Sequence, residues 1–351
     1  MRAAILREYG EPLDITTVPK PEPDTDGVVV EVKACGLCRS DWHAWQGHGE
    51  WNNDRVPTGQ ILGHEPAGTV VAVGDDVERV SQGDNVVVPF SLGDGTCQHC
   101  QSGHGNVCAD GLALGFEPDA PGAFAEQVPV PAVDYNAVDL PDGLSPRDGA
   151  VLGCRYMTAY HGLADRVALT GGDWLAVHGC GGVGLSAVQL GDAMGAQVLA
   201  VDPNESARER ATDLGATATV DPSKRDPVTA IRERTGGADV SVDALGVAET
   251  CRNSVRCLRK RGTHLQLGLT TDKERGVVSL PTDWMTRWEI TFVGSRGMPP
   301  TRYGTLFEFI TTSDVDPGAL VGREVTLESV SERLAAMGTY DTDGVEVVTA
   351  F

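Results

Sequence analysis

The spacing of apolar residues along this chain changes near residue 146. Before that point, short apolar runs such as 28–32, 68–73 and 85–89 are separated by glycine, proline and aspartate, a pattern typical of strands joined by turns. Ser145 and Pro146 then predict a helix start, and residues 148–163 contain few helix breakers. The sequence therefore predicts a β-rich first part and a different architecture after it.

The middle of the chain alternates apolar runs with helical segments. Helices are predicted at 183–194 and 206–214, and strands at 174–178, 197–201, 218–220, 240–244, 264–267 and 290–294. Strands that alternate with helices build a parallel, doubly wound sheet, so we expect an α/β fold with a six-stranded nucleotide-binding domain. The C-terminal residues are too few for a third core, and we expect them to pack on the β-rich first part.

Length and composition narrow the class of protein. The 351 residues suggest two domains, and a hydrophobic content of 41% excludes wholesale disorder. No apolar run approaches the ~20 residues that span a bilayer, and charged residues near the N-terminus argue against a signal peptide. We expect a cytoplasmic protein with no membrane partner.

The charge balance is strongly acidic, at −22, and only five of the 28 basic residues are lysine. A nucleic-acid partner needs a basic face, so we expect no such partner. Acidic residues are spread over the whole chain, and a self-repelling acidic surface stays soluble where salt screens it. We therefore expect a protein of a halophile, with an ordinary acidic protein as the alternative.

One segment carries a dinucleotide-binding pattern. Gly179, Gly181 and Gly184 match G-x-G-x-x-G between a predicted strand and a predicted helix, where glycine allows close approach of a pyrophosphate. Gly182 and Val183 open the helix, whose first N–H groups are free to bind phosphate. The alternative is a tight turn that binds nothing, and the strand–turn–helix context argues against it.

Asp202 ends the next predicted strand, ~20 residues after the glycine loop. A carboxylate there can accept hydrogen bonds from both ribose hydroxyls and would repel a 2′-phosphate. This favours NAD, while Arg208 nearby keeps NADP as an alternative.

Nine cysteines, an odd number, argue against a disulfide framework and point to metal. Near the N-terminus, thiols and an imidazole occur in the stretches CGLCRSDWH and GHEPAG, where Asp41 could orient a ligand imidazole. The second cluster is compact, as structural zinc prefers, and consists of Asp94, Cys97, Cys100 and Cys108. A single ribbon of both CxxC pairs is rejected, because residues 39–96 between them far exceed the usual ~15–20.

These motifs together resemble the zinc-dependent medium-chain alcohol dehydrogenases of the MDR superfamily. The resemblance covers the whole chain, from CGLCRSDWH and GHEPAG through GCRYMTAYHGL and VHGCGGVGLSAV to VSVDALG and VGSRGMPPTRYG. It implies a GroES-like β catalytic domain at 1–152 and 296–351 and a Rossmann domain with a doubly wound, parallel, six-stranded sheet at 153–295. It also implies a homodimer or homotetramer, through the edge of the Rossmann sheet.

The resemblance assigns metal ligands residue by residue. Cys38, His64 and Cys154 match the catalytic zinc ligands, and Glu65 matches a carboxylate that approaches the metal during ligand exchange. The structural zinc of the family usually has four cysteines, and here Asp94 stands in the first position. We expect three cysteines and one aspartate to hold zinc there, with a site that has lost its metal as the alternative.

Other positions match the family's catalytic and binding residues. Ser40 and His43 match the proton relay, whereas Arg39 and Arg302 match arginines near the cofactor. Trp45 and Phe90 match positions of the substrate channel, with Trp42, Trp51 and Trp284 as further candidates. Aromatic walls suit a small alcohol or aldehyde substrate.

The resemblance implies reversible hydride transfer between a primary or secondary alcohol and NAD(P), with zinc holding the alcohol oxygen. A sugar or polyol dehydrogenase of the same superfamily is one alternative, which Cys154 disfavours because those enzymes tend to carry glutamate there. A non-catalytic NAD(H)-binding zinc protein is the other, which intact Ser40 and His43 disfavour.

Overall fold

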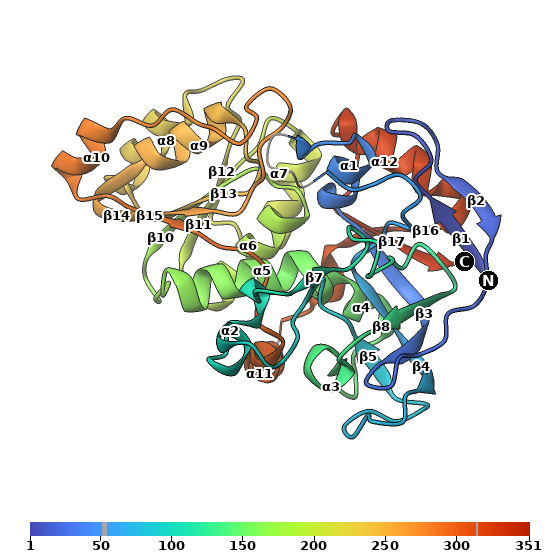
Figure 1. The fold of residues 1–351 in the computed structure, drawn as a ribbon. Helices are drawn as coiled ribbons and strands as arrows, with labels where there is room; N and C mark the ends of the chain where they lie inside the picture. Colours follow the sequence, from blue (N-terminus) through green and yellow to red (C-terminus); the bar gives the residue numbers. More distant parts are fainter. Residues whose placement is uncertain (51–54, 314) are drawn as a thin grey trace. The chain divides into compact units, whose positions relative to one another are not determined.

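The computed structural model describes residues 1–50, 55–313 and 315–351 (Figure 1). The chain divides into two compact units. Unit 1 comprises Met1–Met157, Gly297–Ile310 and Val321–Phe351, and unit 2 comprises Thr158–Arg296 and Thr311–Leu320.

This division differs from the expected domain boundaries: residues 153–157 group with unit 1, and residues 311–320 group with unit 2. Two side chains of unit 2 hold residues 311–320. The Gln189 amide donates to the carbonyl of Asp316 at 2.9 Å, and Arg210 donates to the carbonyl of Leu320 at 3.3 Å. Polar groups of the Rossmann helices therefore hold the returning segment.

Unit 1 is built around a sheet with the strand order β16-β17-β3-β4-β5-β9, in which β8 also pairs with β3. These strands are β3 (Val28–Leu37), β4 (Pro66–Val73), β5 (Asn85–Val87), β8 (Gln127–Val130), β9 (Val138–Asp139), β16 (Val321–Thr326) and β17 (Val345–Ala350). Two small antiparallel pairs accompany the sheet: β1 (Arg2–Ile5) with β2 (Asp14–Thr17), and β6 (Ser91–Leu92) with β7 (Leu112–Ala113).

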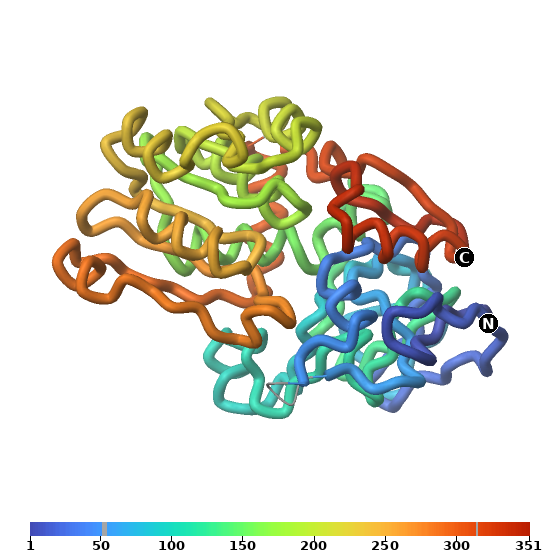
Figure 2. Tube along the Cα trace, turned by 90° about the horizontal axis from the view of Figure 1, so that it is seen from above, coloured from blue at the N-terminus to red at the C-terminus, as the bar shows by residue number. Residues whose placement is uncertain are grey.

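The first and last parts of the chain share this sheet. Strand β17 pairs antiparallel with β3, with Glu346 opposite Leu37 and Val348 opposite Cys35. The two chain termini lie close together in both views (Figures 1 and 2). The C-terminal strands thus pack on the N-terminal β part, as the sequence predicted.

The helices of unit 1 are short. They are α1 (Arg39–Trp45), α2 (Gln98–Gln101), α3 (Val133–Asn136), α4 (Pro146–Val151), α11 (Tyr303–Thr312, which ends in unit 2) and α12 (Val330–Gly338), with 3-10 turns at Gly105–Val107, Pro300–Arg302 and Leu327–Ser329. A capping box of Ser145 and Asp148, followed by Pro146, starts α4 where the sequence predicted a helix. After α4 come a π-helical segment (Leu152–Tyr156), α5 (Met157–Tyr160) and a second π-helical segment (His161–Arg166).

Unit 2 contains the predicted parallel sheet, with the strand order β12-β11-β10-β13-β14-β15. The strands are β10 (Trp174–His178), β11 (Gln197–Val201), β12 (Ala218–Val220), β13 (Ala238–Asp243), β14 (Leu258–Gln266) and β15 (Thr291–Gly294). The first three strands match the predicted bounds. Strand β14 begins six residues earlier than predicted, because Leu258 is followed by Arg-Lys-Arg, which lacks an apolar pattern. Every pairing in this sheet is parallel.

The helices of unit 2 connect these strands. They are α6 (Gly182–Ala193), α7 (Glu205–Asp213), α8 (Pro227–Thr235), α9 (Ala248–Arg256) and α10 (Thr282–Trp288), with a 3-10 turn at Pro317–Leu320. Figure 1 shows α8 and α9 on one face of the sheet and α6 on the other. The order of strands reverses between β10 and β13, and ligands of doubly wound sheets bind at that point. Within the described residues, no helix is long and apolar enough to cross a membrane.

Candidate active site

Four buried donor groups of unit 1 meet in one cluster. The ligand atoms of Cys38, His64, Glu65 and Cys154 all lie within 4.8 Å of one another. Cys38 directly precedes α1, His64 and Glu65 directly precede β4, and Cys154 lies in the π-helical segment Leu152–Tyr156. Such π-helical segments are rare in proteins, and those that occur often lie at functional sites. The fold therefore brings together the three predicted catalytic zinc ligands and Glu65.

Asp41 fixes the orientation of the His64 ring. Its Oδ1 lies 2.8 Å from His64 Nδ1 and also accepts the N–H of Gly63, while its Oδ2 accepts the N–H of Cys38 at 3.0 Å. The hydrogen of the ring is thereby placed on Nδ1. His64 Nε2 is then left as a buried lone pair without a hydrogen-bond partner among the described residues. A lone pair so oriented fits a metal ligand.

The two thiols of the cluster shift each other's pKa in opposite directions. A hydrogen bond from Cys154 holds the pKa of the Cys38 thiol well below its usual value, and it raises the pKa of Cys154. Cys35 behaves differently, because burial raises its pKa well above the usual value. Cys38 is thus prepared to be a thiolate ligand, whereas Cys35 stays a buried thiol.

Glu65 is paired with an arginine that the sequence did not single out. Arg155 Nε donates to Glu65 Oε1 at 3.1 Å and Arg155 Nη2 donates to Oε2 at 2.5 Å, and both side chains are buried. Burial raises the pKa of the Glu65 carboxyl, and the Arg155 guanidinium opposes that rise. The one feature of the sequence that could have identified Arg155 is its position directly after the predicted metal ligand Cys154.

The second cluster also forms. The ligand atoms of Asp94, Cys97, Cys100 and Cys108 lie within 4.8 Å of one another. Backbone N–H groups turn towards these donors: Asp94 N–H donates to Cys108 Sγ at 3.4 Å, and Cys100 N–H donates to Cys97 Sγ at 3.5 Å. The N–H of Cys97 holds the pKa of the Asp94 carboxyl well below its usual value. Three thiols and an ionised carboxylate fit a structural zinc ion.

The predicted relay residues lie at the start of α1. Ser40 Oγ lies 3.9 Å from Cys38 Sγ, directly beside the metal cluster. His43 Nδ1 lies 2.9 Å from Nδ1 of His48, a residue that the sequence analysis left without a role. Burial lowers the pKa of His43 to about 3, with Arg39 acting in the same direction. The His43 ring is therefore neutral at neutral pH.

The predicted channel residues separate into two groups. Phe90 lies edge-on to the His64 ring at 5.8 Å between centroids, and Phe116, which the sequence analysis missed, lies 4.8 Å from the same ring. Trp45 instead packs in the core of unit 1, where its indole N–H donates to the carbonyl of Glu11 at 2.6 Å. Trp42 stacks under the Arg39 guanidinium at 4.1 Å. Trp51 lies outside the described residues.

The glycine loop of unit 2 has the geometry of a phosphate cradle. Gly179 has φ +92°, and a Cβ on Gly184 would lie 1.8 Å from the carbonyl oxygen of Gly179. A Cβ on Gly181 would meet no heavy atom of the described chain within 4 Å. Gly182 and Val183 form the first turn of α6, where in the described structure no side chain caps the N-terminus. The loop is thus tightly packed at Gly184 and open at Gly181, where a pyrophosphate would approach.

Asp202 supports this loop. Its Oδ2 accepts the N–H of Cys180, and its Oδ1 accepts the N–H of Asn204, both at 2.8 Å. One lone pair of each oxygen remains for a ribose. Arg208 donates to the carbonyls of Asp202 and Pro203 and lies 3.4 Å from Asp221, so its guanidinium is engaged within the protein.

A buried polar chain holds the neighbouring loop at the end of β13. Asp243 Oδ1 accepts the N–H groups of Leu245 and Gly246 at 3.0 Å, and Asp243 Oδ2 accepts from Gln266 at 3.0 Å. Gln266 in turn bonds to His264 on the same face of β14. These contacts fix the loop after β13, next to the glycine loop at the reversal of strand order.

Comparison with known proteins shows the family of the chain. Residues 24–142 match the alcohol dehydrogenase GroES-like domain, and residues 182–312 match the zinc-binding dehydrogenase family. An NAD-dependent alcohol dehydrogenase of Sulfurisphaera tokodaii is 32% identical over 99% of both chains. The chain belongs to the zinc-binding alcohol dehydrogenase family.

Two further similarities support this family assignment. An L-threonine 3-dehydrogenase of Bacillus licheniformis is 35% identical over 74% of both chains. The solved structure of an alcohol dehydrogenase from Thermus sp. ATN1 matches over all of both chains with a TM-score of 0.89 and 28% identity. The fold class predicted from the sequence, a GroES-like domain with a Rossmann domain, is therefore confirmed.

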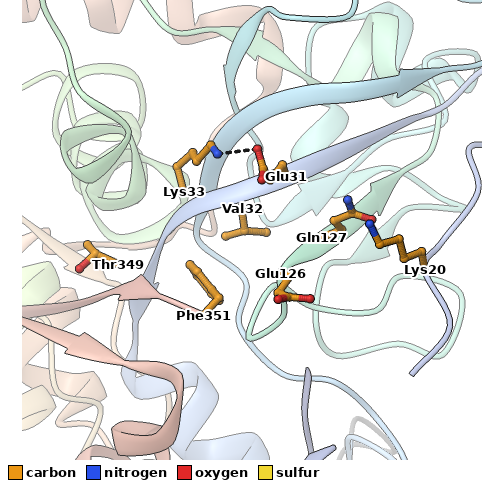
Figure 3. Close-up of a pocket in the computed structure, with 8 residues that line it drawn as sticks. All are labelled: Lys20, Glu31, Val32, Lys33, Glu126, Gln127, Thr349 and Phe351. Atoms are coloured by element: carbon orange, nitrogen blue, oxygen red, sulfur yellow. Dashed lines mark hydrogen bonds and ion pairs between the residues drawn. The ribbon is translucent and has the colours of Figure 1, made fainter. Parts of the chain in front are cut away.

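A separate hollow of about 370 Å³ lies on unit 1 and contains none of the predicted site residues (Figure 3). Lys20, Glu126 and Phe351 are among its lining residues, and Lys33 pairs there with Glu31. Its lining contains charges of both signs.

Two further predicted residues lie apart from the metal clusters. Arg302 lies in the 3-10 turn Pro300–Arg302 of unit 1, and Trp284 stacks on Trp288 in unit 2.

Proposed function

We propose that the protein is a zinc-dependent alcohol dehydrogenase that transfers a hydride reversibly between a primary or secondary alcohol and NAD(P). The observation that carries this proposal is the free, buried Nε2 of His64 beside the thiols of Cys38 and Cys154. Two sulfurs and one imidazole nitrogen are a zinc donor set that leaves one position open.

Each residue of the metal centre has a distinct task in this proposal. Cys38, His64 and Cys154 would hold zinc, and Asp41 keeps the His64 ring in the required tautomer. A bound zinc ion would lower the pKa of an alcohol and polarise a carbonyl in the reverse reaction. Phe90 and Phe116 give an apolar surface beside His64, which suits a small alcohol or aldehyde.

The proton of the alcohol leaves through Ser40 and His43 in this proposal. Ser40 lies beside the ligand Cys38, and the neutral His43 ring has one unprotonated nitrogen that can take up a proton. A hydroxyl can accept one proton and donate another in the same step, so it links the substrate to the imidazole.

Ser40→Ala is expected to lower kcat about 100-fold, which is the low end of what a positioned acid–base group contributes. Zinc content should stay at the parent value, because Ser40 is not a ligand. Ser40→Thr, which keeps a hydroxyl, should retain most of the rate. Steady-state kinetics with zinc analysis checks this, and a normal turnover number in Ser40→Ala would refute the relay.

We infer that NAD is the preferred cofactor and that it binds to unit 2. Gly179, Gly181 and Gly184 shape the cradle, and Asp202 has free lone pairs for ribose hydroxyls and a charge that repels a 2′-phosphate. Arg208 is held by carbonyl groups and Asp221, which disfavours NADP without removing it as an alternative. Bound NAD would accept the hydride, and Arg39 and Arg302 are proposed to meet the cofactor phosphates.

Purified protein with ethanol, benzyl alcohol and glucose, each with NAD and with NADP, tests the proposal. Alcohol-dependent NADH formation supports it. Activity on glucose alone would favour the sugar dehydrogenase alternative, and bound zinc without any turnover would favour a non-catalytic binding protein. A cytoplasmic location stays a prediction.

We infer a homodimer or homotetramer joined at the edge of the unit 2 sheet. Strand β15 pairs only with β14 in the described structure, so no further strand covers its outer edge. Phe292 on this strand is 40% exposed. A second copy of the same edge would extend the sheet and cover this apolar side chain.

A further inference from the structure

The two metal clusters of unit 1 each contain a carboxylate. Glu65 lies in the first cluster and Asp94 lies in the second, and in both clusters all four donor atoms lie within 4.8 Å of one another. Distance alone would make both of them closed sites with four protein ligands. A closed site is structural, whereas catalysis needs an open position.

The neighbours of the two carboxylates differ. Asp94 Oδ1 accepts the N–H groups of Thr96 and Cys97 at 2.8 and 2.9 Å. In the part of the chain that the structure describes, Asp94 has no ion pair, so its other oxygen is available to a metal. Asp94 therefore fits the role of a fourth ligand.

Glu65 is bound on both oxygens by Arg155. The guanidinium donates from Nε to Oε1 and from Nη2 to Oε2, and the N–H of Arg155 adds a third donor to Oε1 at 3.3 Å. Arg155 Nη2 also donates to the carbonyl of Leu37 at 2.6 Å, which anchors the guanidinium to β3. Gly36 makes room for the carboxylate, because a Cβ there would lie 2.1 Å from Glu65 Oε2.

We propose that Arg155 is a positioning residue that holds the Glu65 carboxylate away from the metal and so keeps the fourth coordination position open for the substrate. The inference deepens the proposed function and rests on it for the presence of the metal. Paired, parallel N–H···O bonds between arginine and carboxylate are strong and fix direction as well as distance.

Removal of the arginine would leave Glu65 as a buried negative charge without compensation, which is costly. The metal would then be the cation that compensates this charge, since a carboxylate oxygen of Glu65 already lies within 4.8 Å of the three ligand atoms. Glu65 would occupy the fourth position, and the catalytic centre would become a closed site like the Asp94 cluster.

The test measures the binding of imidazole to the cobalt-substituted protein. Binding is followed by the visible absorption of cobalt, and neither alcohol nor NAD is present. Imidazole changes the spectrum only where a coordination position is open. In the parent, the spectrum is expected to respond. In Arg155→Met, the dissociation constant of imidazole is expected to rise at least about ten-fold, as for other residues that orient metal ligands. Arg155→Met with Glu65→Ala should restore the response.

Arg333 provides a matched control. It is 7% exposed and binds Glu346 with Nε at 2.8 Å and Nη2 at 2.7 Å, in the same unit but outside the cluster. Arg333→Met also loses a buried pair with two parallel bonds, so its thermal stability should fall while the imidazole response stays at the parent value. If Arg155→Met does not fold, Arg155→Lys keeps the buried charge without the paired bonds and should show a smaller loss, again reversed by Glu65→Ala.

An imidazole response in Arg155→Met equal to that of the parent would overturn the proposal. So would a loss that persists in the double variant, because Glu65 could not then be the competing ligand. A parent that responds to imidazole yet oxidises no alcohol would contradict the proposed function, and the same loss in Arg155→Met would still support the role of Arg155.

Discussion

Cys38→Ala is expected to remove one of two zinc ions per chain and to lower kcat/KM at least about a thousand-fold. Cys38, His64 and Cys154 are the three ligands of the catalytic centre, and the loss of one thiolate leaves a site too weak to retain the metal. The metal supplies several kcal/mol of charge stabilisation, and each ~1.4 kcal/mol is a factor of ten in rate. Metal analysis of the dialysed variant and steady-state kinetics measure both effects.

Cys35→Ala is the matched control for this prediction. Cys35 lies in the same CxxC pair and is fully buried, but burial keeps its thiol protonated, and Cys35 is not a member of either metal cluster in the described structure. We expect two zinc ions and near-parental activity in Cys35→Ala. Loss of zinc from Cys35→Ala with retention in Cys38→Ala would reverse the assignment of the ligand.

Gly184→Ala is expected to lower both stability and NADH binding, whereas Gly181→Ala is expected to lower NADH binding alone. A Cβ on Gly184 would lie 1.8 Å from the carbonyl oxygen of Gly179, and the backbone there cannot yield without opening the packing of α6 against the loop. We expect the free energy of unfolding of Gly184→Ala to fall by about 1–3 kcal/mol or more. NADH binding should fall with it.

Gly181→Ala should keep the fold, because its Cβ would meet no heavy atom of the described chain within 4 Å. The added methyl would instead occupy the space that a pyrophosphate needs, and the dissociation constant of NADH should rise at least about ten-fold, or ~1.4 kcal/mol. Thermal melting and fluorescence titration with NADH separate the two variants, and zinc content should be unchanged in both. Parental NADH affinity in Gly181→Ala would show that the phosphates do not lie on this loop.

Residues that act through their own donor atoms could be predicted from the sequence. Cys38 and His64 lie in short motifs, and the resemblance of these motifs to the zinc-dependent family singled them out. The glycine loop could also be predicted, because Gly179 needs a positive φ and Gly184 has no room for a side chain. The parallel sheet followed from apolar runs that alternate with helices.

Features that depend on distant contacts could not be predicted. Arg155 and Glu65 are far apart in the sequence, and only the folded chain shows that they form a buried pair. Trp45 matched a channel position, but no motif predicted its bond to the carbonyl of Glu11 or its packing in the core of unit 1. Segment 311–320 joined unit 2 through single side-chain bonds that no composition pattern reveals. Adaptation to high salt stays a prediction.

Direct hydride transfer is tested with benzyl alcohol that carries deuterium on the carbinol carbon. The zinc-loaded parent is expected to form NADH with one deuterium on the nicotinamide ring, and Cys38→Ala is expected to form none. Deuterium released to water, or the absence of labelled NADH from a zinc-loaded parent, would contradict direct hydride transfer at this site.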